Sequence, residues 1–273
     1  MALRLLSAVV GVPIVFACIY FGGIGWWLLL FAATAATSWE IIRILLPGDD
    51  LKRIRILLNG YAAVVTVLYI SVPRQSIVLT IVTPLILLTV GLTVLAYRFG
   101  LEGSINRLGR AFIGVLYAPM TLSCLYELRR LGDDRQGYNW VLLVMGMTWL
   151  ADTGAYFLGR AIGRTPFAPM VSPKKTWEGF FGAVVAAGVW ALIMQVFFMP
   201  QLTWYEPWIL AAPIAAFGAM GDLTESLIKR DAGIKDSSNL IPGHGGMFDR
   251  LDALMFTAPV MYLYAALVHP LLH

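Results

Sequence analysis

Charged residues are scarce in this sequence: Asp, Glu, Lys and Arg make up 13% of the 273 residues, whereas hydrophobic residues make up 59%. The mean hydropathy is +0.76. A water-soluble domain needs more polar surface than this, so the composition excludes an ordinary soluble protein and favours an integral membrane protein.

Cysteine is also scarce. The chain has two, Cys18 and Cys124, and both lie in apolar runs without the spacing of a metal site or a redox pair. We interpret them as packing residues. The sequence also has no internal repeat, which argues against the paired repeats found in many transporters.

Nine apolar segments approach the roughly 20 residues that a helix needs to cross a bilayer. Several contain Pro or Gly, which membrane helices tolerate better than soluble helices do. The sequence therefore predicts an all-α, polytopic integral membrane protein with about nine transmembrane helices. The expected spans are residues 5–21, 23–40, 54–72, 76–97, 110–128, 138–159, 179–199, 207–229 and 250–271.

Lys and Arg gather on one side of this predicted bundle. The N-terminus and the loops after spans 2, 4, 6 and 8 would share 16 of the 20 basic residues. The positive-inside rule then places the N-terminus and the loops 160–178 and 230–249 in the cytoplasm, and His273 outside. No small-residue cleavage site follows the first segment, so we expect it to be retained as a helix.

The stretch from Ser226 to Asp252 concentrates charge of both signs between two apolar segments. Charge near a bilayer is costly, so such a cluster indicates a site. Its cations could neutralise phosphate groups, and its glycines let the backbone approach a ligand closely. Carboxylates are the hard oxygen ligands that Mg²⁺ prefers. Together these features indicate a nucleotide or phosphate site that uses a metal ion.

Spacing supports this interpretation. If 221–230 is helical, Asp222, Glu225, Ser226 and Lys229 share one face. Asp249 and Asp252 lie one turn apart at the expected start of the next helix. For this last pair, simple compensation of a helix N-terminus is an equally good explanation.

Two earlier blocks carry further polar residues. Asp152 lies within an apolar span, where a central Asp costs about 2.5–3.5 kcal/mol, so it should face the protein interior. A structural ion pair with Arg160 or Lys174 is the alternative to an active-site role. Lys174 and Lys175 precede a helix expected to open at Thr176, which predicts a phosphate seat or a basic flank of a cytoplasmic helix end.

Glu40 and Arg43 close the second apolar span. We expect both at its interfacial end, beside lipid headgroups.

The order S-x-x-K-R-x4-K-D-x-S-x2-I-P-x-H-G-G-x-x-D-R-x-D, from Ser226 to Asp252, resembles the signature of the phosphatidate cytidylyltransferases, also called CDP-diglyceride synthases. Two further blocks resemble this family, Asp152 to Tyr156 with Gly159 and Arg160, and Ser172 to Gly179. The resemblance covers about residues 146–252. The first half of the chain resembles the family only in being apolar.

This resemblance implies a Mg²⁺-dependent nucleotidyltransferase of phospholipid biosynthesis, which converts CTP and phosphatidic acid to CDP-diacylglycerol and pyrophosphate. A second cation is compatible with the number of acidic residues. The expected catalytic residues are Asp152, Asp222, Lys229, Lys235 and Asp249. The expected metal ligands are Asp222, Glu225, Ser226, Asp249 and Asp252. The expected substrate-binding residues are Ser172, Lys174, Lys175, Arg230, His244, Gly245, Gly246 and Arg250.

We expect residues 1–135 to be a transmembrane scaffold and residues 136–273 to be the catalytic region, with a cytoplasm-facing cavity. The expected partners are CTP, phosphatidic acid and the lipid bilayer of a bacterial inner membrane. A homodimer is compatible with the sequence, and no nucleic acid partner is expected. Two alternatives remain open: a CTP-dependent kinase of lipid alcohols, which would transfer the γ-phosphoryl group, and, less favoured, a membrane transporter with buried charges.

Overall fold

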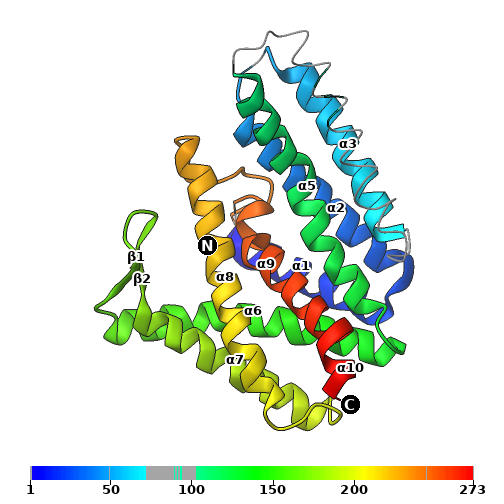
Figure 1. Ribbon diagram of the computed structural model, residues 1–273, viewed down its shortest axis with the longest axis vertical. Coiled ribbons are helices and arrows are strands. Elements are labelled where there is room, and N and C mark those ends of the chain that lie inside the picture. The colour runs from blue at the N-terminus through cyan, green and yellow to red at the C-terminus, as the bar shows by residue number, and fades with distance from the viewer. Residues whose placement is uncertain are drawn as a thin grey trace.

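The computed structural model describes residues 2–48, 50–71, 103–243 and 245–272, together with the isolated positions 89, 91 and 93. The described chain is mostly helical, with one short β-hairpin between two helices (Figure 1). The helices are α1 (Ala2–Phe21), α2 (Gly23–Leu45), α3 (Lys52–Ser71), α5 (Ser104–Arg129), α6 (Asp134–Ile162), α7 (Trp177–Phe197), α8 (Glu206–Asp231) and α9 (Phe248–Leu263). A π-helical turn η2 (Tyr264–Val268) joins α9 to α10 (His269–Leu272), and the hairpin pairs β1 (Pro166–Ala168) with β2 (Ser172–Thr176) in antiparallel register.

Among the described residues, six helical stretches are long and apolar enough to cross a membrane: α2, α3, α5, α6, α7 and the continuous stretch Phe248–Leu271. The predicted class, an all-α membrane protein, is therefore confirmed at this level. α8 is not among the six, because its last three turns carry several charged residues. α1 contributes a shorter apolar helix, Val9–Phe21. The predicted span 76–97 lies outside the described residues, apart from the isolated positions 89, 91 and 93.

α7 shows what the surroundings of this bundle must be. Phe181, Val185, Val189 and Val196 are all exposed along it, and their spacing places them on one face of the helix. A contiguous stripe of large apolar side chains is unfavourable in water. It is the expected surface of a helix that faces lipid chains.

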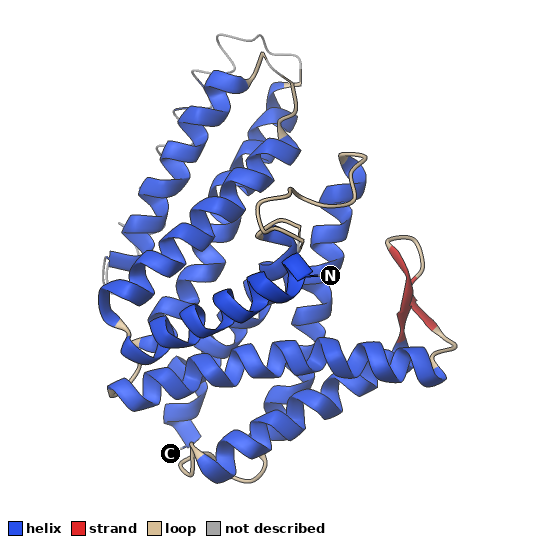
Figure 2. Cartoon of the chain, turned by 180° about the vertical axis from the view of Figure 1, so that it is seen from behind, coloured by secondary structure: helices blue, strands red, loops and turns tan. Residues whose placement is uncertain are grey.

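α6 and α7 pack against each other along their length and run across the direction of the steeper helices α3 and α5 (Figures 1 and 2). Small residues permit the close contact. A Cβ atom on Gly154 would lie 2.4 Å from the carbonyl oxygen of Gly182, and one on Gly182 would lie 2.6 Å from that of Gly154. Only glycine fits at such a crossing, as is common between membrane helices. Gly159 continues this seam against Gly179.

α8 and α9 approach just as closely. A Cβ atom on Gly221 would lie 2.4 Å from the carbonyl oxygen of Asp252 and 3.0 Å from the Cα atom of Ala253. The next residue along α8 is Asp222. The glycine therefore brings the acidic residues of the two helices together.

The contacts of two arginines show which helix ends lie together. Arg129, at the end of α5, is buried and donates to the carbonyl oxygens of Ile19 (2.8 Å) and Asp134 (3.0 Å), which lie near the end of α1 and the start of α6. Arg110, near the start of α5, instead donates to the carbonyl oxygen of Leu45 (3.2 Å) at the end of α2 and pairs with Asp231 (3.3 Å) at the end of α8.

The buried core has two parts. The larger cluster contains residues of α1, α2, α5, α6, α7, α8 and α9, with Ile70 from α3, and the smaller one joins α2, α3 and α5 around Ile42, Val65 and Val115. α2, α3 and α5 thus contribute to both clusters. They connect the first third of the chain to the region that carries the charged residues.

The α6–α7 seam gives a direct test. We expect Gly182→Ala to lower the apparent melting temperature in detergent, because the new methyl group overlaps the backbone of Gly154 and overpacking costs about 1–3 kcal/mol. Gly60→Ala in α3 is the matched control, since its Cβ would meet nothing within 4 Å. An equal melting temperature for the Gly182 variant and wild type would contradict the seam.

Candidate functional site

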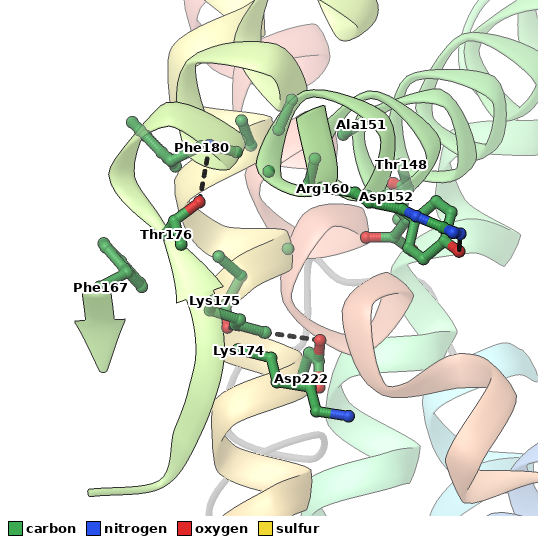
Figure 3. Close-up of a pocket in the computed structure, with 18 of the residues that line it drawn as sticks. Thr148, Ala151, Asp152, Arg160, Phe167, Lys174, Lys175, Thr176, Phe180 and Asp222 are labelled. Atoms are coloured by element: carbon green, nitrogen blue, oxygen red, sulfur yellow. Dashed lines mark hydrogen bonds and ion pairs between the residues drawn. The ribbon is translucent and has the colours of Figure 1, made fainter. Parts of the chain in front are cut away.

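A cavity of about 630 Å³ lies between α6, β2, α7 and α8 (Figure 3). Part of its wall is apolar, from Phe180 and Ala183 of α7 and Ile214 and Ala215 of α8. The charged side chains gather in the remaining part of the lining. They are Asp152, Arg160, Lys174, Lys175 and Asp222.

An ion pair joins two sides of this cavity. The Nζ atom of Lys175, on β2, lies 2.6 Å from Oδ2 of Asp222, on α8, and Figure 3 shows Asp152 of α6 among the residues around the same space. Both partners keep contact with solvent, since 24% of the Lys175 side chain and 39% of the Asp222 side chain are exposed. The pair is therefore accessible to a ligand that enters the cavity.

Three carboxylates converge here, and the Asp222 of this ion pair is one of them. Asp222, Glu225 and Asp252 each offer an oxygen atom, and these oxygens lie within 4.8 Å of one another. α8 supplies two of them from one helix face, as the sequence predicts, and the close approach of α9 at Gly221 supplies the third. Like charges at this separation repel unless a cation lies between them. A set of hard oxygen donors with this spacing fits a Mg²⁺ ion.

Asp249 has a different environment. Its Oδ2 atom accepts from the backbone N–H groups of Gly246 (2.8 Å) and Ser237 (3.1 Å) and lies 3.0 Å from the Ser237 hydroxyl. Its Oδ1 atom lies 2.9 Å from Nζ of Lys229. Asp249 is outside the group of three converging carboxylates. Its carboxylate therefore holds amides of the loop before α9 and the Lys229 ammonium, and the N–H groups of Met247 and Phe248 at the start of α9 donate to Glu40 instead.

Lys229 links Asp249 to the acidic group. Its Nζ atom lies 2.6 Å from Glu225 and 2.9 Å from Asp249. All three side chains are largely buried, with exposed fractions of 14%, 6% and 8% respectively. The lysine therefore offsets two carboxylates that are shielded from water.

The remaining predicted residues lie around these two groups. Asp152 is exposed to the cavity and forms no ion pair with any residue in the described part of the chain, while Arg160 donates to the hydroxyl of Tyr156 (2.8 Å). The alternative to an active-site role, a structural ion pair of Asp152 with Arg160 or Lys174, is thus not formed. Lys174, Arg230, Lys235 and Arg250 are exposed, Ser172, Ser226 and Gly245 are partly buried, and Gly246 is buried. His244 lies outside the described residues.

The hairpin fixes the position of the two lysines. Thr176 caps α7 by accepting from the N–H of Gly179 (3.2 Å), which confirms the predicted helix start. Glu178 then accepts from the N–H groups of Arg164 (3.1 Å) and Thr165 (3.2 Å), so both ends of the hairpin are held against α7. The sequence did not predict these strands: Lys174 and Lys175 lie on β2 instead of in an irregular loop.

Sequence reasoning missed the partners of Glu40. It lies near the end of α2, as expected, but it is fully buried. It accepts from the hydroxyls of Ser237 (2.9 Å) and Ser238 (2.5 Å) and from the N–H groups of Met247 (2.9 Å) and Phe248 (2.7 Å). The one local signal was an acidic residue at the end of an apolar run. That signal does not identify partners about 200 positions away.

A second cavity, of about 610 Å³, is lined by Trp39 and Arg43 of α2 and by part of the segment between α8 and α9. The guanidinium of Arg43 lies 5.4 Å from the centroid of the Trp39 ring. Ser237 and Ser238, which donate to Glu40, are among the lining residues.

The fold and the site together define a helical membrane protein in which Asp222, one of three converging carboxylates, lines a partly apolar cavity together with Asp152 and three cations. The chain belongs to the cytidylyltransferase family, whose model matches residues 2–268. This match confirms the predicted resemblance and extends it over the first half of the chain, which carries no recognisable motif.

Relatives support this assignment. A phosphatidate cytidylyltransferase of Bacillus subtilis is 35% identical over 162 residues, which are 59% of this chain and 60% of the relative. One of Staphylococcus epidermidis is 34% identical over 177 residues (64% and 66%), and one of Brucella suis is 38% identical over 154 residues (56% of each). The aligned part thus spans less than two thirds of the length of these relatives.

The buried position of Lys229 gives a prediction about stability. We expect Lys229→Met to destabilise the protein by about 3–5 kcal/mol, because it leaves buried carboxylates without their cation. The double variant Lys229→Met/Glu225→Gln should recover part of the loss, since it also removes one of the uncompensated charges. Thermal unfolding in detergent measures both.

Arg230→Met is the control for this experiment, because Arg230 is the exposed neighbour of Lys229. If both single variants unfold at the wild-type temperature, the lysine does not stabilise the two carboxylates.

Proposed function

We propose that the protein transfers the cytidylyl group of CTP to phosphatidic acid and releases pyrophosphate, forming CDP-diacylglycerol. The observation that carries this proposal is the acidic group of Asp222, Glu225 and Asp252 beside Lys175, at a cavity with a partly apolar wall. Such a site suits a substrate that combines phosphate with hydrocarbon. Membership of the cytidylyltransferase family and the names of the relatives support the same reaction.

The chemistry requires positioning more than a strong base. A phosphate monoester has a second pKa near 6, so the phosphate of phosphatidic acid is largely ionised at neutral pH. One of its oxygens attacks the α-phosphorus of CTP and forms the new P–O bond, while the bond to the β-phosphate oxygen breaks and pyrophosphate leaves. The protein contributes by aligning two anionic substrates and neutralising their charge.

Asp222, Glu225 and Asp252 would hold Mg²⁺, with Ser226 near them on the same helix face. When bound, the ion neutralises charge on the triphosphate and on the leaving pyrophosphate. A second cation remains compatible with this number of carboxylates. Asp249, first predicted as a ligand, is better suited to hold Lys229 and the loop beside the acidic group, given its four contacts.

Lys174 and Lys175 are assigned to substrate phosphate, because the hairpin presents both at the cavity. Lys175 also restrains Asp222 before substrate binds. Asp152 lines the cavity and forms no ion pair with any described residue. It is therefore assigned to orient substrate or to extend the acidic group. Further phosphate and backbone contacts are assigned to Ser172, Arg230, Lys235, His244, Gly245, Gly246 and Arg250.

The proposal includes an orientation in a bacterial inner membrane. Nine spans would place the N-terminus and the cavity on the cytoplasmic side, where CTP is available, and the C-terminus outside, following the distribution of Lys and Arg. Residues 1–135 would act as scaffold and residues 136–273 as the catalytic region. Phosphatidic acid would enter from the bilayer, and a homodimer is compatible with this arrangement.

The first test is turnover by purified protein in detergent. With CTP, phosphatidic acid and Mg²⁺ we expect CDP-diacylglycerol and pyrophosphate in equal amounts, and no turnover when EDTA removes divalent cations. Supplying a long-chain lipid alcohol in place of phosphatidic acid is the control. A phosphorylated alcohol and CDP as products would instead favour the lipid-alcohol kinase.

The metal site gives a second test. We expect Asp222→Asn to lower kcat by about 100-fold, a loss typical of removing one group that stabilises transition-state charge, and to raise the Mg²⁺ concentration at half-maximal rate. The measurement is a Mg²⁺ titration of the initial rate.

Asp134→Asn is the control, because the Asp134 side chain is fully exposed at the opposite end of α6. An Asp222→Asn enzyme with the wild-type Mg²⁺ dependence would place the metal ion elsewhere.

A further inference from the structure

Glu40 is a fully buried carboxylate that the proposed reaction leaves without a role. It lies in α2, in the half of the chain that carries no motif, yet all four of its hydrogen-bond partners belong to residues 237–248. We infer that Glu40 is a positioning residue for the site: it holds the loop residues 237–238 and 246–247 and the first turn of α9 in the arrangement that presents Asp252 and Asp249.

The contacts are divided evenly between the two carboxylate oxygens. Oε1 accepts from the Ser238 hydroxyl (2.5 Å) and the Met247 N–H (2.9 Å), and Oε2 accepts from the Ser237 hydroxyl (2.9 Å) and the Phe248 N–H (2.7 Å). Each oxygen therefore accepts one hydrogen bond from a hydroxyl of the loop and one from a backbone N–H at the start of α9.

The two amides explain why a carboxylate is needed. The first N–H groups of a helix have no partner within the helix, and α9 begins at Phe248. Glu40 supplies the missing acceptor from another helix and brings negative charge to the positive end of the helix dipole. Phe248 is itself fully buried, so water cannot supply that acceptor.

Gly246 shows how closely the loop is fitted around this carboxylate. A Cβ atom there would lie 2.6 and 2.7 Å from the two oxygens of Glu40 and 1.9 Å from the Ser237 hydroxyl. Any other residue at position 246 would displace Glu40 or the loop. This contact gives a physical reason for a glycine in the Gly245–Gly246 pair.

A chain of contacts leads from Glu40 to the acidic group. The Ser237 hydroxyl lies within 3.0 Å of both Glu40 and Asp249, Asp249 pairs with Lys229, and Lys229 pairs with Glu225. One turn of α8, from Glu225 to Lys229, and the start of α9 are thus tied to α2. A loss of the Glu40 contacts would free the loop and shift the carboxylates that the proposed function assigns to Mg²⁺.

The variant that tests this inference is Glu40→Gln, which keeps the size of the side chain. An amide nitrogen cannot accept a hydrogen bond. In either orientation of the Gln side chain, the NH₂ group therefore faces one backbone N–H and one hydroxyl that donate to a carboxylate oxygen in the wild type. Glu206→Gln is the matched control. Glu206 is equally buried and accepts from Thr203 and Tyr264, but it lies 19 residues before Glu225 on α8, about 28 Å along the helix axis.

The first readout does not depend on activity. Lys235 is exposed, two residues before the first loop residue that Glu40 holds, so trypsin cleavage after Lys235 reports release of the loop. We expect this cleavage, followed by the mass of the C-terminal fragment, to be at least about 10-fold faster in Glu40→Gln than in wild type and unchanged in Glu206→Gln. Equal rates in Glu40→Gln and wild type, or equal acceleration in both variants, would overturn the inference.

The second readout rests on the proposed function. We expect Glu40→Gln to lower kcat by about 10–100-fold, as for residues that orient metal ligands, and to raise the Mg²⁺ concentration at half-maximal rate. A purely structural role would reduce the amount of folded enzyme and leave the Mg²⁺ dependence unchanged. If wild type makes no CDP-lipid, the proposed function fails, whereas the cleavage experiment still tests the positioning role.

A second variant keeps the inference testable if Glu40→Gln does not fold. Ser238→Ala removes one of the four donors and leaves Glu40 in place. Its cleavage after Lys235 should be faster than in wild type by a smaller factor, and a wild-type rate would count against the role assigned to Glu40.

Discussion

The close crossing of α8 and α9 at Gly221 is the contact on which the candidate site depends. Because neither backbone could approach the other past a Cβ atom, this glycine determines that Asp222 and Glu225 lie beside Asp252. Converging carboxylates are tolerated in an apolar protein only when cations compensate them. Lys175 from the hairpin and Lys229 from α8 supply that compensation, so the hairpin and the loop are both tied to this crossing.

The α6–α7 pair contributes a mixed apolar and charged lining to the site. Its glycine seam brings the two helices together, and the hairpin that connects them stands over the end of the pair (Figure 2). The lining of the cavity then includes small, aromatic and charged side chains. A single space of this kind can contact hydrocarbon and phosphate at the same time, which a purely polar surface cleft could not do.

Features with local causes were predictable from the sequence, and features with distant causes were not. The lengths of the apolar runs predicted the described helices, and helix periodicity predicted that Asp222, Glu225 and Lys229 share one face. The start of α7 followed from Thr176. Sequence spacing could not separate the roles of Asp249 and Asp252, because the difference arises from loop amides that only Asp249 reaches. The hairpin had no alternating pattern and depends on Glu178 of the next helix. The partners of Glu40 are set by tertiary packing alone.

The separation of Glu40 from its partners also has a consequence for biosynthesis. Phe248 follows Glu40 by 208 residues, which a ribosome takes roughly 10–40 s to synthesise at about 5–20 residues per second. Throughout that interval α2 carries, near its end, a carboxylate whose two oxygen atoms lack the hydrogen-bond donors that they have in the folded protein. The nascent chain must keep this end of α2 in contact with water or the lipid headgroups until α9 arrives, so the first and last parts of the bundle can reach their final packing only once the whole chain has been made.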